Sequence, residues 1–223
     1  SFSDVFVFDT IYSVNAYKLP FAPFVGLDNK GISILFECAL IQSETAETFE
    51  WLFREWCLEN EGSFPAAIMM DQCPSMSKVI AEVFPPTTTH FLCIWHIYRK
   101  YCVKFSGPLG ARFNEFVGEL MSLMEITRID VVERQWPVLH KYNLSSNTHL
   151  SELYKVKKKW FSCYVKEHFT GSMSTTGRSE SMNLSFDGYF TRTAAMIELA
   201  KRFEDAVRDR NLARVKKDIE RKN

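Results

Sequence analysis

The sequence predicts an α/β fold in which a mixed sheet, with the element order βββαβαβ, is interrupted by an all-helical insertion. The 223 residues are 46% hydrophobic and 24% charged, a composition typical of a folded globular protein. Apolar, β-branched segments dominate the first forty residues and are joined by short connections, which indicates antiparallel neighbours. From Trp95 to Phe169 the apolar residues instead recur at helical spacing.

The predicted elements of the core follow one another closely along the chain. The first three strands form a meander. Ser43 or Thr45 is available to cap the first helix, and Pro74 opens the second. We expect strands at Asp4–Tyr12, Leu19–Leu27, Ser33–Ile41, Ala66–Met70 and Thr88–Cys93, and helices at Thr45–Glu59 and Pro74–Val83.

The second half of the chain is predicted to be helical, with breaks at Gly107-Pro108 and Tyr142–Asn147. A polar loop, Gly171–Gly177, leads to a last segment that ends in the charged helix Ala194–Arg221. We therefore expect three regions: the first part of the core at 1–96, an all-helical insertion at 97–170, and a region at 171–223 that completes the core. The amphipathic stretches are Phe113–Met124, Val131–Tyr142 and Leu150–Phe169.

Charge is balanced over the whole chain but not along it. Residues 1–96 carry 4 Lys and Arg against 12 Asp and Glu, a net charge of −8, whereas residues 97–223 carry 23 against 15, a net charge of +8. An acidic half concentrates divalent cations and a basic half neutralises phosphates. The alternative is that long helices simply carry solvated charges. The same two interpretations apply to Lys201–Lys222, with 9 basic against 5 acidic residues.

The cysteines and the lengths of the apolar runs indicate where in the cell the protein is expected. No run approaches the roughly 18 apolar residues that cross a bilayer, so we expect no membrane association. The six cysteines are scattered, several in apolar segments, which favours free thiols in a reduced, intracellular compartment. The chain starts almost directly inside a strand, and we therefore expect an excised domain whose targeting signals lie elsewhere.

Two acids each follow an apolar strand: Asp9 after Val5–Phe8 and Asp71 after Ala66–Met70. In a meander followed by a parallel strand, the first and fourth strands can lie side by side, which places both acids at one edge of the sheet. Paired carboxylates repel one another unless a hard cation such as Mg²⁺ or Mn²⁺ lies between them. Glu180 is the candidate third carboxylate. Taken singly, Asp9 also fits a turn cap and Glu180 a first-turn helix acid.

The segment from His90 to His96 contains a Cys-x-x-His pattern, Cys93 and His96. It supplies half of a zinc site, with His90 as a third ligand, but no second Cys/His pair lies near it, so we expect no zinc. Cys93 is expected to end a buried strand and His96 to orient a neighbour or contact substrate. Trp95 either stacks on a base or is buried. Because there is no glycine-rich phosphate loop and no Gly-x-Ser-x-Gly, metal-dependent chemistry on a phosphodiester is the remaining chemical hypothesis.

Several motifs in a fixed order point to one family. They include Phe8-Asp9-Thr10, Pro20–Gly26, Phe49-x-Trp51-Leu52-Phe53, Cys93-x-Trp95-His96-Ile97 and Arg178-Ser179-Glu180-Ser181-Met182-Asn183. From about residue 4 to residue 190 the chain resembles the Mutator-like element (MULE) transposase domain, which also occurs in the plant far-red-impaired response family of domesticated transposases.

The resemblance implies an RNase H-like core with a DDE triad, and the helical insertion before the last catalytic helix. The triad maps to Asp9, Asp71 and Glu180, which would hold two Mg²⁺ or Mn²⁺ ions for DNA cleavage and strand transfer. It implies DNA (transposon ends or a promoter) and a second copy of the chain as partners, no small-molecule cofactor, and a nuclear location. The residues that it places next to DNA are Cys93, Trp95, His96, Arg178 and Asn183.

One departure keeps two functions open. Family members commonly have Thr-Asp-Gln-Asp around the second acid, whereas this chain has Met70-Asp71-Gln72-Cys73, so one acid is absent. The first hypothesis is an active DDE transposase domain. The second is a domesticated transcription regulator that keeps the fold and has lost catalysis. A structural zinc-binding domain is a third and weaker hypothesis. The family's N-terminal DNA-binding domain and C-terminal SWIM zinc finger lie outside this chain.

Overall fold

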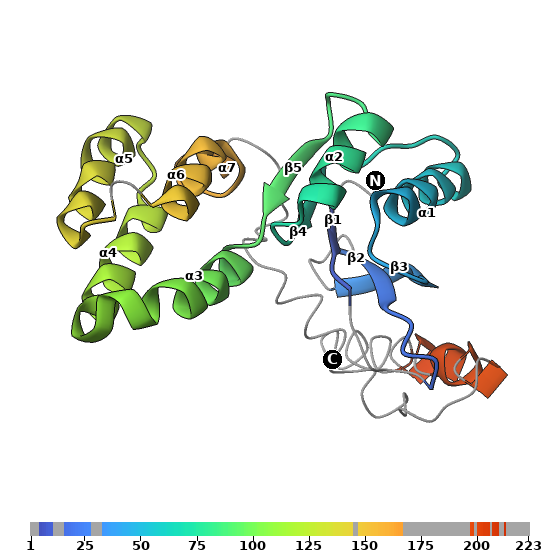
Figure 1. Ribbon diagram of the computed structural model, residues 1–223. Coiled ribbons are helices and arrows are strands. Elements are labelled where there is room, and N and C mark those ends of the chain that lie inside the picture. The colour runs from blue at the N-terminus through green and yellow to red at the C-terminus, as the bar shows by residue number, and fades with distance from the viewer. Residues whose placement is uncertain are drawn as a thin grey trace, which may run out of the picture.

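The computed structural model describes residues 5–10, 16–27, 33–144 and 147–166, together with residues 197–198, 200–205, 207–209 and 212. Its centre is a five-stranded mixed sheet in the order β3-β2-β1-β4-β5 (Figure 1). This confirms the predicted α/β class and the order βββαβαβ, with strands somewhat shorter than expected. The strands are β1 (Val5–Phe8), β2 (Phe21–Leu27), β3 (Ser33–Leu40), β4 (Ala67–Met70) and β5 (Thr89–Leu92).

Strand β1 lies in the middle of the sheet and joins its two halves. It pairs antiparallel with β2, which pairs antiparallel with β3, and it pairs parallel with β4, which pairs parallel with β5. The β2–β3 register shifts between Phe24 and Val25, and the ring of Phe36 then lies over Gly26. A Cβ atom at Gly26 would lie 2.0 Å from Cε2 of Phe36, so only glycine fits this position without movement of the ring.

Helices α1 (Ala46–Glu59) and α2 (Pro74–Val83) cover one face of the sheet. Because side chains alternate along a strand, Phe6 and Phe8 face these helices while Val5 and Val7 face the opposite side. Phe6 contacts Trp56 of α1 at a ring-centroid distance of 5.0 Å. The side chain of Thr45 accepts a hydrogen bond from the backbone N–H of Thr48, which confirms the predicted cap of α1.

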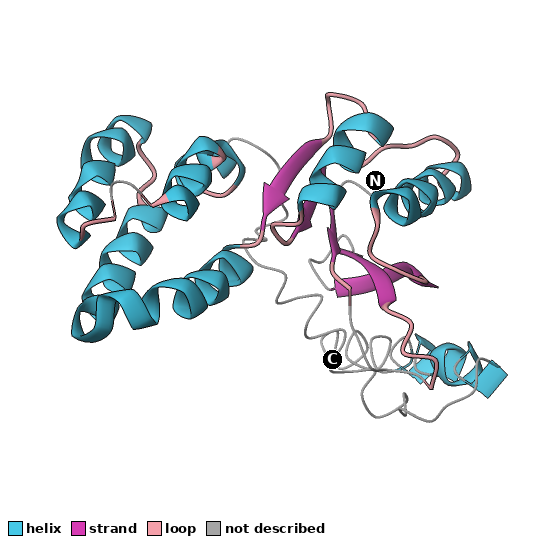
Figure 2. Cartoon of the chain, in the orientation of Figure 1, coloured by secondary structure: helices cyan, strands magenta, loops and turns pink. Residues whose placement is uncertain are grey.

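The second part of the chain is a separate group of helices to one side of the sheet (Figures 1 and 2). These helices have their own hydrophobic core. Its buried residues include Leu92, Phe105, Phe116, Leu139 and Cys163. The elements are α3 (Ile94–Leu109), η1 (Gly110–Arg112), α4 (Phe113–Glu125), α5 (Ile129–Gln135), η2 (Trp136–Tyr142), α6 (Thr148–Lys155), η3 (Lys157–Lys159) and α7 (Ser162–Val165), where η marks a 3-10 helix.

The predicted break at Gly107-Pro108 lies one or two residues before the observed end of a helix. Helix α3 runs through Gly107-Pro108 and ends at Leu109, because Pro108 lies in its last turn and removes only one backbone donor; Gly110, with a φ of 50°, then ends the helix. The predicted amphipathic stretch Leu150–Phe169, as far as it is described, consists of α6, η3 and α7 in succession. The Trp160 indole, after η3, donates to the carbonyl of Leu153 in α6 at 3.1 Å.

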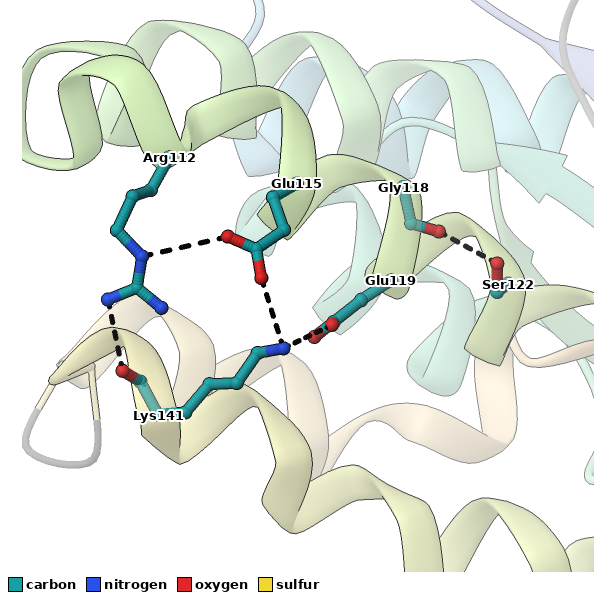
Figure 3. A network of polar contacts seen from close by, with 6 residues as sticks. All are labelled: Arg112, Glu115, Gly118, Glu119, Ser122 and Lys141. Atoms are coloured by element: carbon teal, nitrogen blue, oxygen red, sulfur yellow. Dashed lines mark hydrogen bonds and ion pairs between the residues drawn. The ribbon is translucent and has the colours of Figure 1, made fainter.

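The stretch Val131–Tyr142 is divided as well, between α5 and η2. Pro137 stands at the second position of η2 and has no backbone donor to continue an α-helix. Ion pairs fasten η2 to α4: Lys141 contacts Glu119 and lies 3.2 Å from Glu115, which in turn pairs with Arg112 (Figure 3).

A second polar cluster, around Glu133, connects α5 to α6, η3 and α7. Glu133 accepts hydrogen bonds from Tyr154 and, at 2.6 Å, from Tyr164, and it lies 2.6 Å from Nζ of Lys157. Three donors on one carboxylate favour its charged form. The hydrogen bonds from Lys157 and the two tyrosines therefore lower the pKa of Glu133 from 4.5 to about 2.

The predicted polar loop and most of the predicted C-terminal region lie outside the described residues. Those that are described between 197 and 212 are helical, and Phe203 contacts Phe21 of β2 at a ring-centroid distance of 6.3 Å. No helix in the described part of the chain is long and apolar enough to cross a membrane.

Replacing Glu133 by Gln is expected to lower the free energy of unfolding by about 1–2 kcal/mol at neutral pH, because the charged acceptor of three donors is lost. A carboxyl group whose pKa is lowered in the folded state stabilises the fold at pH values above its ordinary pKa of 4.5. The parent should therefore lose this advantage as the pH falls from 4.5 towards 2. Urea unfolding at several pH values measures both effects.

Glu152→Gln is the matched control in the same helical part. Glu152 pairs with Lys155 at 2.7 Å, but the two side chains are 63% and 66% exposed. An exposed pair of this kind contributes little, so the control should unfold like the parent. Equal losses in the two variants would contradict the role given to Glu133.

Candidate functional site

The two strand-end acids lie at the same edge of the sheet. Strands β1 and β4 are parallel neighbours with Val7 opposite Met69, so Asp9 and Asp71 each follow that pair by two residues. Neighbouring strands are about 4.8 Å apart, and side chains repeat every two residues. Both acids therefore stand at the carboxyl ends of adjacent parallel strands. The sequence predicts that Asp9 and Asp71 lie at one edge because β1 and β4 are neighbours, and the structure has this parallel pairing.

The carboxyl group of Asp71 is held in an unfavourable environment for a negative charge. Its Oδ1 atom is buried and has no hydrogen-bond partner among the described residues. Burial, with a smaller contribution from the negative charge of Glu44, raises the pKa of Asp71 above its usual 3.8, and Lys100 partly offsets this rise. Oδ1 therefore keeps its lone pairs available for a further partner.

Glu44 is a further acid at this edge, from the connection between β3 and α1. It accepts a hydrogen bond from the hydroxyl of Thr10, the residue after Asp9. Because β3 runs in the same direction as β1, the segment that follows β3 emerges at the edge where Asp9 and Asp71 lie. The edge therefore concentrates negative charge from three separate segments.

The first turns of α3 bring basic groups to the same place. Helix α3 starts directly after β5, and Nε2 of His96 lies 4.0 Å from Oδ2 of Asp9, with both side chains mostly buried at 23% and 17% exposure. Lys100, one turn further along, donates to Oε1 of Gln72 at 3.3 Å. The start of α3 thus lies at the same edge as the acids, and the position of His96 beside Asp9 fits the first of its two predicted roles, orienting a neighbour or contacting substrate.

Cys93 and Trp95 flank this site in different ways. Cys93 is fully buried and precedes the first residue of α3, where its backbone N–H donates to the carbonyl of Met70 at 2.8 Å. It therefore ties β5 to β4 beside Asp71. Trp95 is half-buried, in contact with the His96 ring at 4.9 Å and with the Arg99 guanidinium at 4.8 Å from its centroid.

His90 has a structural place away from the acids. Its Nδ1 atom lies 3.1 Å from Nζ of Lys159, which joins β5 to the helical part. Burial, together with the nearby Lys159 charge, lowers the pKa of His90 to about 3, so the ring is neutral at physiological pH. The alternative use of His90 as a third zinc ligand would place the metal next to an ammonium group.

The remaining predicted site residues, Arg178, Glu180 and Asn183, lie outside the described residues. Within the part of the chain that is described, no three His, Cys, Asp or Glu side chains gather closely enough to hold a metal ion. The fit of Asp9 and Asp71 to a divalent cation therefore depends on the buried, unpaired Oδ1 of Asp71 and on the oxygen donors that Mg²⁺ and Mn²⁺ prefer.

Sequence reasoning missed Glu44, Gln72 and Lys100 at this site. Glu44 looks like an acid before a helix cap, and Lys100 like one cation of a solvated helix. A usable indication existed only for Lys100, which is four residues after His96 and so lies on the same side of α3.

Comparison with known proteins gives one consistent result. Residues 5–100 match the family model of the MULE transposase domain. Over its whole length the chain is 34% identical to Protein FAR1-RELATED SEQUENCE 5 of Arabidopsis thaliana, of which it spans 28%. Protein FAR-RED IMPAIRED RESPONSE 1 of Arabidopsis thaliana is 30% identical over 91% of the chain, which spans 24% of that relative. The chain is thus similar to a quarter or slightly more of these longer proteins.

A solved structure is also similar over part of the chain. It is the simian T-cell lymphotropic virus intasome in complex with PP2A regulatory subunit B56 gamma, 13% identical, with 66% of this chain and 49% of that chain covered. The TM-score of 0.30 is too low to support an argument about this protein.

Replacing Asp71 by Asn is expected to stabilise the protein in the absence of metal, by about 1 kcal/mol or about 2–4 °C in the melting temperature. A raised carboxyl pKa means that the charged form is disfavoured in the fold. The parent therefore loses stability as the pH rises above 3.8, whereas the variant does not titrate. Thermal melting in EDTA should show the gap at neutral pH and its closure in acid.

Asp130→Asn is the control of opposite sign. The hydrogen bonds from Arg128, together with the nearby charges, lower the pKa of Asp130, so its loss should not stabilise the protein. A destabilised Asp71→Asn variant would contradict the electrostatic description of the site.

Proposed function

Through residues 5–100 the chain belongs to the MULE transposase domain family, and we propose that it is the core of a transposase-derived, DNA-associated transcription regulator of the far-red-impaired response type. One observation carries this choice over an active transposase. The similarity to the FAR1-related proteins continues over the whole chain, through the helical part, whereas the match to the transposase domain ends at residue 100.

The second acid motif supports the same choice. Cys73 stands where the resemblance leads us to expect an acid, and its Sγ lies 3.0 Å from the Ser75 hydroxyl at the start of α2. In this position the thiol continues the local packing and offers no hard oxygen ligand. In the proposed regulator the RNase H-like fold serves as a scaffold in the nucleus, and promoter DNA and a second copy of the chain are its partners.

A transposase activity is the second candidate, and the carboxyl edge of the sheet favours it. Asp9 and Asp71 follow adjacent parallel strands, and Oδ1 of Asp71 is buried with no partner among the described residues. With Glu180 they would hold Mg²⁺ or Mn²⁺. Such a cation supplies the Lewis acidity that activates water or a DNA 3′-hydroxyl at a phosphodiester. His96 would keep Asp9 oriented for that ligand role.

The regulator is tested by reporter output from the full-length protein that contains this domain. Asp9→Asn should leave the output unchanged, because a scaffold does not use the carboxylate. Trp56→Asp, which places a charge at a core position that is 1% exposed, should abolish the output. An Asp9→Asn output as low as that of Trp56→Asp would refute the proposal.

The transposase candidate is tested by calorimetric titration of Mn²⁺ into the chain. The parent should bind, and both Asp9→Asn and Asp71→Asn should bind at least tenfold more weakly, because each variant removes one ligand from a shared site. Glu152→Gln, far along the chain and paired with Lys155, should bind like the parent. Unchanged binding in the two Asn variants would exclude a joint carboxylate site.

A further inference from the structure

Half of the Lys and Arg residues described between 97 and 166, six of twelve, are matched by nearby acids. Each of these cations lies within 4.0 Å of a carboxylate oxygen. They are Arg112, Arg128, Arg134, Lys141, Lys155 and Lys157. Of the other six, Lys158, Lys159 and Lys166 lie near the end of the helical part, where Lys159 contacts His90 and Lys166 donates to the carbonyl of Thr127.

Three cations of α3 have partners of another kind. Arg99 lies over the Trp95 ring, Lys100 donates to Gln72, and Lys104 contacts His149, with Nζ 2.6 Å from Nε2. None of these partners carries a negative charge, so the three positive charges remain unneutralised by them. Arg99 and Lys100 are exposed and Lys104 is half-buried.

Their spacing places these cations in line with the acids. Lys100 and Lys104 are four residues apart on one side of α3, and Arg99 lies next to Lys100. His96, four residues before Lys100, extends this row to a line about 12 Å long. Ile97, Tyr101 and Phe105, each about 100° further round the helix, are buried in the helical part. His96, at the start of this line, lies 4.0 Å from Asp9.

The contacts that hold the row leave it little freedom. The Trp95 ring fixes the Arg99 guanidinium at 4.8 Å, and His149 at the start of α6 fixes Lys104. Side chains that are already ordered lose less entropy when they bind. A chain of phosphates is a ligand that matches cations aligned along a helix.

We propose that the α3 row, defined as Arg99, Lys100 and Lys104, is a DNA-backbone contact that guides one strand to the edge where Asp9 and Asp71 lie. The inference rests on the proposed function and adds to it the surface that holds the DNA. The contacts are to phosphates, so the row provides affinity and position and carries no sequence preference.

The test is DNA binding by the full chain in EDTA, measured by fluorescence anisotropy with a short labelled duplex and with a single strand over a range of salt concentrations. Whichever of the two DNAs, duplex or single strand, the parent binds more tightly, the triple variant Arg99→Gln/Lys100→Gln/Lys104→Gln should bind it at least tenfold more weakly at low salt. Each lost phosphate contact removes about 0.9 from the salt slope on duplex and about 0.7 on a single strand, so the slope should fall by about 2–3.

The matched control is Arg128→Gln/Arg134→Gln/Lys155→Gln, which removes the same charge from residues that are paired with Asp130 and Glu152. It should keep the parent's affinity and salt slope. Thermal melting of both triple variants shows whether they are folded. Equal losses in the two triple variants, or a parent that binds neither form of DNA, would overturn the inference.

The outcome is separable from that of the proposed function. Anisotropy in EDTA requires neither metal nor transcription. A reporter that depends on Asp9 would refute the regulator while leaving the α3 contact measurable. A triple variant that binds DNA like the parent would refute the α3 contact even where the reporter behaves as proposed.

Discussion

The parallel pairing of β1 with β4 is the constraint on which the rest of the structure depends. Parallel neighbours need a long crossover, and the meander and α1 supply it before the chain returns at Ala67. The pairing puts the ends of two buried strands side by side. An acid after each strand then becomes a carboxylate pair, although 62 residues separate Asp9 from Asp71 in the sequence. The strand topology, and not the local sequence around each acid, therefore brings Asp9 and Asp71 to the same edge.

The same edge collects charges of both signs because several elements begin or end there. Glu44 arrives after β3, and Lys100 arrives one turn after His96 in the helix that follows β5. Burial disfavours the charge of Asp71, and the nearby Glu44 disfavours it further, while Lys100 acts in the opposite direction. A cation or a phosphate that entered this edge would therefore meet both an excess of carboxylate and a row of ordered bases.

Strand order and the placement of Asp9 and Asp71 follow from the sequence, because apolar strand runs and short connections restrict the topology to few choices. The breaks in the helical part follow from it only in part: those predicted at Gly107-Pro108 and Tyr142–Asn147 lie close to the ends of α3 and η2, whereas the change from α6 to η3 is not predicted. The Trp160 indole donates to the carbonyl of Leu153 across that change, a contact that periodicity does not contain. Glu44 and the α3 row were equally invisible, since their roles depend on which elements lie at the same edge and on which cations already have acidic neighbours.

A regulator and a cation site are compatible in one chain because they require different residues. Contact with DNA phosphates requires the ordered bases of α3 and no carboxylate. A scaffold, in turn, gains nothing from a buried oxygen without a partner at Asp71, where asparagine would be more stable. The proposed cation site would account for that acid, whereas the fold alone does not. The proposed cation site and the proposed DNA contact use different residues of one edge, so a loss of catalysis would affect only the first.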